Sequence, residues 1–223
     1  MTAMQVQILD YGLGNANSIA SCLRDIGCYA QVTKDPAVLS QAEVIFIPGV
    51  GSFAQGMKNL QASGLDRVLH DIHQRNRTYL VGICLGMQLF ATTSEEGAQN
   101  GQACAGLGWI PGSVKSLKHV CKNNRLPHIG WNNLLVEDRE EPLTRGLNGE
   151  PFYFDHEYFF ETDDKYVQGV FEYGVPVPCI VRHGKVIGFQ FHPEKSQISG
   201  KKLLIQTLIE TGVERRAVWI ESV

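Results

Sequence analysis

The chain has 223 residues, 43% of them hydrophobic, and a formal net charge of −3. This is enough for one substantial core, so we expect a single domain over residues 1–223, and so small a charge gives no reason to expect binding to nucleic acid or an anionic membrane. Neither a signal peptide nor an apolar run near the roughly 20 residues that cross a bilayer is visible. We therefore expect a soluble, cytoplasmic protein whose six cysteines are thiols.

The first half of the chain alternates predicted strands and helices. The strands are expected at residues 6–10, 29–33, 44–47 and 79–83, and the helices at 16–26, 65–75 and 85–92. This alternation is typical of an α/β fold with a doubly wound, mostly parallel sheet. Ligands bind such sheets outside the carboxyl ends of the strands.

The second half contains shorter predicted strands separated by turns. They are expected at residues 112–117, 132–136, 152–160, 167–173 and 179–181, after a Gly-rich loop at 97–108 and before a closing helix at 199–210. Clustered strands of this kind predict a small antiparallel extension packed on the parallel sheet. The tail at 213–223 suggests no function.

Two weak patterns suggest ligands, and neither is complete. Gly12 and Gly14 follow the first strand, but Asn17 stands where a dinucleotide-binding motif has its third glycine, so we expect no cofactor. A metal site built on His119, Cys121 and His128 lacks any supporting Cys-x-x-Cys pair, so we expect no metal.

Cys84 stands where the strand at 79–83 gives way to a helix. A sharp strand-to-helix turn exposes a nucleophile and crowds the backbone, so small residues are needed two positions before and after it, where Gly82 and Gly86 stand. The helix start would also favour the thiolate. The alternative is a small buried cysteine at the end of a close-packed strand.

A base and its orienting group lie over a hundred residues later, in Gly-Phe-Gln-Phe-His-Pro-Glu (188–194). Residues two apart in an extended segment project to the same side, so His192 and Glu194 can act together. His192 would accept the thiol proton, and Glu194 would fix the imidazole tautomer. A histidine near a strand end, taken alone, is more often structural.

These motifs resemble the class I glutamine amidotransferases, whose triad is Cys, His and Glu. The resemblance lies in the segments Gly-Ile-Cys-Leu-Gly-Met-Gln (82–88) and Gln-Phe-His-Pro-Glu-Lys-Ser (190–196). Further motifs at 10–15, 48–53 and 127–132 narrow the resemblance to the glutaminase subunits of imidazole glycerol phosphate synthase. The resemblance covers roughly residues 5–212 and implies a flavodoxin-like core.

The resemblance assigns roles to individual residues. It implies a triad of Cys84, His192 and Glu194, and an oxyanion hole at Val50, Gly51 and Leu85. Glycines after a buried strand also suit an oxyanion hole on physical grounds, although an ordinary strand-exit turn looks the same. The residues implied to bind glutamine are Gln88, Glu96 in preference to Glu95, His156, Glu157 and Tyr158.

The resemblance also implies a partner. Free ammonia is protonated at neutral pH and no second active site is visible, so a partner must receive the ammonia by a sheltered route. In the family this partner is a (β/α)8-barrel cyclase, which forms a heterodimer with the glutaminase subunit. The interface and ammonia passage are expected near Trp131, Asn132 and Tyr153.

One segment departs from the family pattern, in which Asp155 would be apolar and Glu157 a small hydroxyl residue. The departure keeps open a glutaminase that feeds another synthetase, such as one amidating a surface-polysaccharide sugar. Two alternatives of other classes are a non-catalytic binding subunit and an autonomous cysteine hydrolase. The presence of all three triad residues argues against the first of these.

Overall fold

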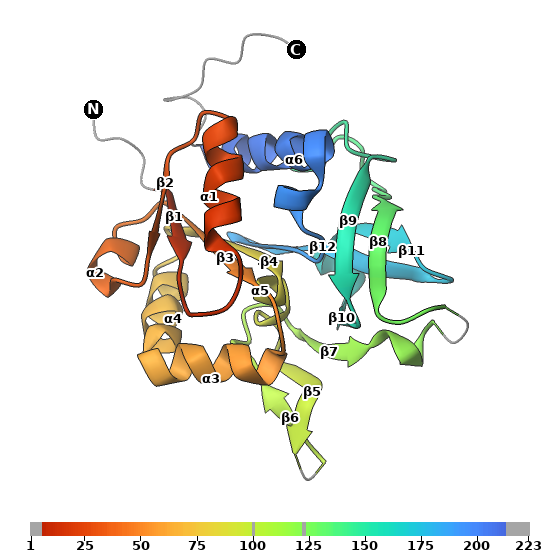
Figure 1. The fold of residues 1–223 in the computed structure, drawn as a ribbon, viewed down its shortest axis with the longest axis horizontal. Helices are drawn as coiled ribbons and strands as arrows, with labels where there is room; N and C mark the ends of the chain where they lie inside the picture. The colour runs from red at the N-terminus through yellow and green to blue at the C-terminus, as the bar shows by residue number, and fades with distance from the viewer. Residues whose placement is uncertain (1–5, 100, 122–123, 213–223) are drawn as a thin grey trace.

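A seven-stranded sheet forms the centre of the molecule (Figure 1). The computed structural model describes residues 6–99, 101–121 and 124–212. In spatial order the strands are β2 (Ala30–Thr33), β1 (Val6–Leu9), β3 (Val44–Gly49), β4 (Tyr79–Cys84), β13 (Val186–Phe189), β12 (Pro176–His183) and β11 (Val167–Glu172). The first five pair in parallel, and the last two are added antiparallel. The expected mostly parallel α/β sheet is confirmed.

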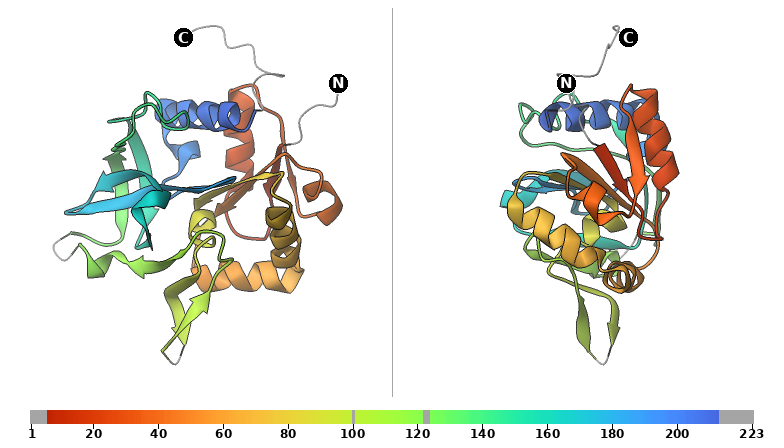
Figure 2. Two further views of the ribbon diagram at one scale, coloured as in Figure 1. Left: turned by 180° about the vertical axis from the view of Figure 1, so that it is seen from behind. Right: turned by 90° about the vertical axis from the view of Figure 1, so that its left-hand side faces the viewer.

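Helices cover both faces of this sheet (Figures 1 and 2). Side chains alternate along β3, so Val44 and Phe46 pack on one face and Ile45 and Ile47 on the other. The first face is covered by α1 (Ala16–Asp25) and α6 (Gln197–Glu210). The second is covered by α2 (Pro36–Leu39), α3 (Phe53–Ser63) and α4 (Leu65–Arg75). The core is therefore two apolar layers separated by the sheet.

Two smaller sheets extend this framework. One contains, in order, β10 (Tyr158–Thr162), β7 (Gly112–Ser116), β5 (Thr93–Gln99) and β6 (Gln102–Ala105). The other pairs β8 (His128–Asn133) with β9 (Pro151–His156). The β5–β6 hairpin projects from the body of the molecule in every view (Figures 1 and 2). The extension is antiparallel except for the β5–β7 pair.

Several details of the sequence prediction were wrong. The loop predicted at 97–108 contains most of the β5–β6 hairpin, and the helix α3 was missed. The strand predicted at 132–136 lies earlier, in β8. The strand predicted at 152–160 is divided at Glu157, because β9 pairs with β8 whereas β10 pairs with β7 in a different sheet.

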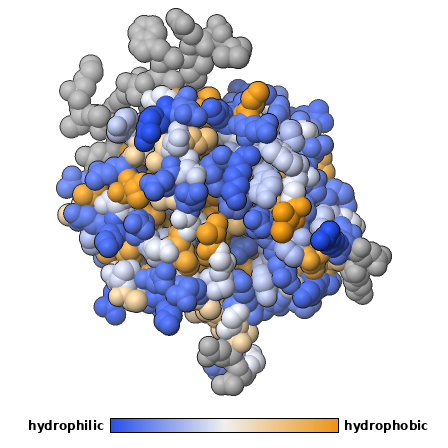
Figure 3. Space-filling model, viewed as in Figure 1, coloured by the Kyte–Doolittle hydropathy of each residue, from blue (hydrophilic) through white to orange (hydrophobic). Residues whose placement is uncertain are grey.

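The visible surface is mainly hydrophilic, with small scattered apolar patches (Figure 3). Among the described residues, the exposed large apolar side chains are those of Tyr29, Val50, Ile129, Trp131, Leu135, Ile198 and Ile209. Within the described ranges, no helix is both long and apolar enough to span a bilayer. The tail at 213–223, for which the sequence suggested no function, lies outside the described residues.

Candidate active site

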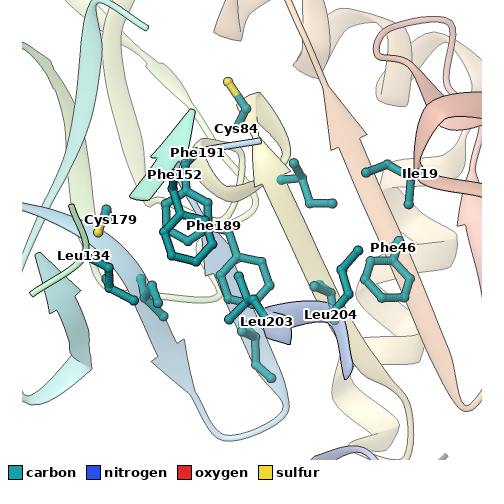
Figure 4. Close-up of a cluster of buried hydrophobic side chains, with 14 of the residues drawn as sticks. Ile19, Phe46, Cys84, Leu134, Phe152, Cys179, Phe189, Phe191, Leu203 and Leu204 are labelled. Atoms are coloured by element: carbon teal, nitrogen blue, oxygen red, sulfur yellow. The ribbon is translucent and has the colours of Figure 1, made fainter. Parts of the chain in front are cut away.

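Cys84 ends β4 and lies at a strained turn. Its φ and ψ are 54° and −111°, a positive φ that residues other than glycine seldom adopt. Figure 4 shows its sulfur at the end of the strand, pointing away from the buried hydrophobic cluster. The strain therefore turns the thiol out of the sheet, as a nucleophile requires.

The glycines on either side allow this turn to close tightly. A Cβ added to Gly82 would lie 2.6 Å from the backbone carbonyl carbon of Gly86. A Cβ added to Gly86 would lie 1.7 Å from the carbonyl oxygen of Ile47, on β3. No side chain fits at either position. This agrees with the expectation from the sequence that small residues are needed two positions before and after Cys84.

The helix after Cys84 is shorter than the predicted 85–92. The structure has only the single turn α5 (Leu85–Gln88), followed by turns that include Leu89 and Phe90. A helix of one turn has few aligned peptide dipoles, so it gives less support to a thiolate than the predicted helix would give. The positive charge must come mainly from elsewhere in the site.

His192 supplies this positive charge, and Glu194 stabilises it. The Nδ1 atom of His192 lies 2.9 Å from Oε1 of Glu194, and both side chains are at least 95% buried. The extended segment predicted for this pair was wrong, since β13 ends at Phe189 and residues 193–195 form a 3-10 turn. It is this turn that brings Glu194 back onto the imidazole.

The charge state of His192 follows from its surroundings. Burial alone would lower the pKa of His192, but hydrogen bonds to Cys84 and Glu194 and their negative charges outweigh it and raise the pKa to about 10. Because Nδ1 faces Glu194, Nε2 remains for the sulfur. The arrangement favours an imidazolium beside the sulfur of Cys84, so His192 holds the proton that a leaving group needs.

A cavity of about 270 Å³ opens onto Cys84. All of the predicted oxyanion and substrate residues line it, together with Pro127 and Asp155. The lining is Val50, Gly51, Cys84, Leu85, Gln88, Glu96, Pro127, Asp155, His156, Glu157, Tyr158 and His192. The structure thus brings together residues from distant parts of the sequence.

The two neighbouring glutamates on β5 face different surroundings. Glu96 lines the cavity, and its Oε2 accepts a hydrogen bond of 2.8 Å from the backbone N–H of Phe53. Glu95 instead accepts hydrogen bonds from the N–H of Ser116 and from His119. Burial raises the pKa of Glu96, the Phe53 N–H opposes this, and the charge of Glu157 adds to it. Of these two glutamates, only Glu96 is placed to meet a cationic group in the cavity.

Asp155 and Glu157, the two departures from the family pattern, both line this cavity. Glu157 forms an ion pair of 3.0 Å with Lys118, and both side chains remain partly exposed. Asp155 is exposed, and its backbone carbonyl lies 4.0 Å from the sulfur of Cys84. The cavity therefore combines a buried reaction centre with a partly exposed acidic mouth.

Gln190 is a polar residue to which the sequence analysis gave no role. It is completely buried directly after β13, with its side chain between Gln88 and Cys84. A glutamine between two phenylalanines in an otherwise apolar segment was the available signal, because a buried amide needs hydrogen-bond partners.

Two buried histidines lie beside the cavity. His156 Nδ1 is 2.8 Å from the carbonyl oxygen of Tyr158, so Nδ1 carries the hydrogen and Nε2 is free to accept. His128 Nδ1 donates to that Nε2 at 3.3 Å. Burial lowers the pKa of His128 to about 4 and that of His156 to about 3. Both rings are therefore neutral at physiological pH.

The residues predicted for the partner interface lie just outside the cavity. Trp131 on β8 is 47% exposed and packs edge-on against Tyr153 of β9, which lies 6.5 Å from the ring of His192. The side chain of Asn132 instead donates to the carbonyl of Glu172. Trp131 and Tyr153 thus form a continuous aromatic contact from the surface to the site.

Neither a metal-ligand cluster nor a second cavity offers an alternative site among the residues that the structure describes. In the described part of the chain, no group of three or more His, Cys, Asp or Glu side chains is placed to hold a metal ion. A second cavity of about 370 Å³ is lined by Leu135, Glu137, Asp138, Glu141, Asp164, Val167, Gln168, Gly169 and Val170. It contains no cysteine, serine or histidine, so this cavity does not support nucleophilic chemistry.

Comparison with known structures supports this fold. A crystal structure of a glutamine amidotransferase superposes with a TM-score of 0.72 at 21% identity, over 93% of this chain and 99% of that one. The structure of PurLQS from Thermotoga maritima gives 0.69 at 17% identity, over 94% and 99%. At these identities the likeness concerns the fold alone.

Sequence comparison is more specific. The model of the family "Glutamine amidotransferase class-I" matches residues 7–211. The imidazole glycerol phosphate synthase subunit HisH of Carboxydothermus hydrogenoformans is 41% identical over 88% of this chain and 95% of its own length. That of Moorella thermoacetica is 40% identical over 89% and 91%. The chain therefore belongs to the class I glutamine amidotransferases, which hydrolyse glutamine, and within them to the family of HisH subunits.

Proposed function

We propose that this chain is the glutaminase subunit of an imidazole glycerol phosphate synthase of histidine biosynthesis. The observation that carries the proposal is that Cys84 and His192 line one cavity while Glu194 is bonded to His192, in a chain about 40% identical to HisH subunits. The chain would act in the cytoplasm as one half of a heterodimer. Its product, ammonia, would pass to a (β/α)8-barrel cyclase.

The first chemical step would be attack by the Cys84 thiolate on the side-chain amide carbon of glutamine. The N–H of Leu85 and one from the segment of Val50 and Gly51 would stabilise the oxyanion. His192 would give its proton to the departing ammonia as the C–N bond breaks and a thioester forms. Water would then attack the thioester carbon, with His192 taking the water proton, and the C–S bond would break to release glutamate and regenerate the Cys84 thiolate.

Glutamine would lie with its side chain toward Cys84 and its α-ammonium toward the acidic mouth. Glu96 supports this orientation because its carboxylate is partly buried, lines the cavity and is held by the Phe53 N–H. A charged hydrogen bond in such surroundings contributes more than one in open solvent. Glu157, which is already paired with Lys118, would contribute less.

Ammonia transfer would take place beside β8. Ile129 and Trp131 are 60% and 47% exposed on this strand, and aromatic contacts run from Trp131 through Tyr153 toward His192. Exposed aromatic side chains are favoured at protein interfaces. A cyclase docked here would shelter the route that leaves the cavity.

The test is glutamate release from glutamine by the chain mixed with the cyclase subunit and its ribonucleotide substrate. We expect strong stimulation over the chain alone, formation of imidazole glycerol phosphate, and loss of both in Cys84→Ala. Glutamate release without binding to the cyclase would contradict the assigned partner and favour another synthetase. A folded complex that releases no glutamate would contradict the glutaminase assignment.

A further inference from the structure

Behind Cys84 lies a short chain of buried side-chain amides. Gln190 is 0% exposed and Gln88 is 5% exposed. The Nε2 atom of Gln88 is 2.9 Å from Oε1 of Gln190, and Nε2 of Gln190 is 3.9 Å from the sulfur of Cys84, which is within reach of the large sulfur atom. A fully buried glutamine thus makes a side-chain contact to the nucleophile.

The hydrogen-bond partners fix the direction of these amides. Nε2 of Gln88 donates to two acceptors, the carbonyl of Tyr158 at 2.9 Å and Oε1 of Gln190. Because a backbone carbonyl can only accept, the nitrogen of Gln88 must face Tyr158. Gln190 must then turn its oxygen toward Gln88, which leaves its N–H groups facing the sulfur.

The carbonyl of Tyr158 is itself a fixed point. It accepts a second hydrogen bond, of 2.8 Å, from Nδ1 of His156, whose Nε2 accepts from His128. Both histidines are buried and the Tyr158 carbonyl is partly buried, so each unmade hydrogen bond would carry a desolvation penalty. The amide chain is therefore held in place from the end remote from Cys84.

Donation from Gln190 affects the two protonation states of Cys84 differently. A thiolate is a much better hydrogen-bond acceptor than a thiol, and the contact lies in a water-poor interior where charge interactions are strong. The N–H of Gln190 therefore lowers the free energy of the thiolate relative to the thiol. It also limits the directions in which the sulfur can move.

We propose that Gln190 is a positioning residue that holds Cys84 as an aligned thiolate, with Gln88 anchoring its amide to the carbonyl of Tyr158. The proposal rests on the proposed function only in taking Cys84 as the nucleophile. With its nitrogen committed to Tyr158 and Gln190, Gln88 has its carbonyl oxygen left to offer to N–H donors of a substrate. The same amide pair thus links substrate binding to the state of the sulfur.

The test is the pH dependence of Cys84 alkylation by iodoacetamide, followed by mass spectrometry of the peptide that contains Cys84. This readout needs neither glutamine nor a partner, so it is independent of the proposed function. In Gln190→Met we expect the midpoint of the profile to move up by about one pH unit. At a pH below the midpoint the alkylation rate should fall about tenfold.

The matched control is Gln7→Met, which makes the same change at a buried glutamine on β1 outside the active-site cavity. It should leave the midpoint where it is in the unchanged protein. Thermal unfolding of each variant separates loss of stability from loss of the sulfur contact. A stable Gln190→Met variant with an unchanged midpoint would overturn the proposal.

Gln88→Met provides a second variant, because it removes the anchor and leaves the donor on Gln190 in place. We expect a smaller upward shift of the midpoint, with slower glutamate release in the complex. If Gln190→Met does not fold, an unchanged midpoint in Gln88→Met overturns the proposal. If the midpoints shift as expected but the complex releases no glutamate, the proposed function fails and the role of Gln190 stands.

Discussion

The inner and outer walls of the cavity hold their polar groups in different ways. The inner wall, formed by Cys84, Gln88, His156 and His192 with Gln190 behind, consists of side chains that are all at most 6% exposed. The outer wall carries Glu96, Asp155 and Glu157, which remain in contact with water to varying extents.

This difference follows from the task of each wall. Bond breaking needs groups fixed to within a fraction of an ångström, and burial with complete hydrogen bonding provides this. Recognition of a charged substrate end needs carboxylates, whose desolvation is costly, so they lie near the surface. Changes to the inner wall should therefore reduce turnover, whereas changes to the outer wall should weaken substrate binding.

The largest effect is expected for Cys84→Ala, which removes the nucleophile from the inner wall. Glutamate release in the presence of the cyclase subunit and its ribonucleotide should fall at least about 10⁴-fold, with no loss of cyclase binding. Cys104→Ala, a partly exposed cysteine outside the cavity, is the control and should retain activity. Appreciable turnover by Cys84→Ala would show that the inner wall does not supply the nucleophile.

Glu194→Gln should lower kcat by about 10²- to 10⁴-fold. Glu194 holds Nδ1 of His192 and helps to raise its pKa to about 10, so the variant should have a lower His192 pKa and a smaller imidazolium fraction above neutral pH. The pH profile of kcat checks this, and its alkaline limb should move to lower pH. Glu150→Gln, a carboxylate bonded to Ser199 and Lys202 outside the cavity, is the control.

Two substitutions on the outer wall compare a partly buried carboxylate with a more exposed ion pair. Glu96→Gln should raise the KM for glutamine by roughly 10- to 100-fold, the value of one charged hydrogen bond. Glu157→Gln should change KM by less than about fivefold, because its pair with Lys118 is partly exposed. Steady-state kinetics of the complex measure both. The reverse order of effects would mean that Glu157 receives the α-ammonium.

The smallest effect concerns stability, and it tests the buried histidines. Their folded-state pKa values, about 4 for His128 and about 3 for His156, lie below the ordinary value of about 6.5. The stabilisation is therefore complete above pH 6.5 and is lost as pH falls from there toward 4, where the unfolded chain binds more protons. Each histidine contributes a slope of up to about 1.4 kcal/mol per pH unit.

His128→Phe should remove about half of the pH slope of the unfolding free energy that His128 and His156 contribute together. Phenylalanine suits the position, since the His128 ring lies between Phe154, Phe171 and Tyr173. Urea unfolding at several pH values between 4.5 and 7 gives the slope. An unchanged slope would show that His128 is protonated in the folded protein and that water reaches the inner wall.

Local patterns explain which parts of this molecule the sequence analysis predicted. An apolar run marks the strand at 79–83, glycines mark the turn at Cys84, and helical spacing marks the helix at 65–75. They match β4, the strained turn at Cys84 and α4. The helix α3 was also marked, by Ser52 before a helical spacing of Phe53, Met57 and Leu60, and was overlooked.

Other features depend on contacts between distant segments. The β5–β6 hairpin is polar and Gly-rich, and pairing of β5 with β7 helps to hold it in a sheet. The break at Glu157 exists because β9 and β10 belong to different sheets. The hydrogen bond from Gln190 to Cys84 joins residues 106 positions apart. No local pattern in the sequence specifies such pairings.

The central claim is that Cys84 reacts with glutamine bound between the two walls. The most direct test is labelling of the complex with the electrophilic glutamine analogue 6-diazo-5-oxo-L-norleucine, followed by peptide mass spectrometry. We expect one adduct, on Cys84, that glutamine prevents and that forms more slowly in Glu96→Gln. An adduct on another cysteine, or labelling of Cys84 that glutamine does not prevent, would contradict it.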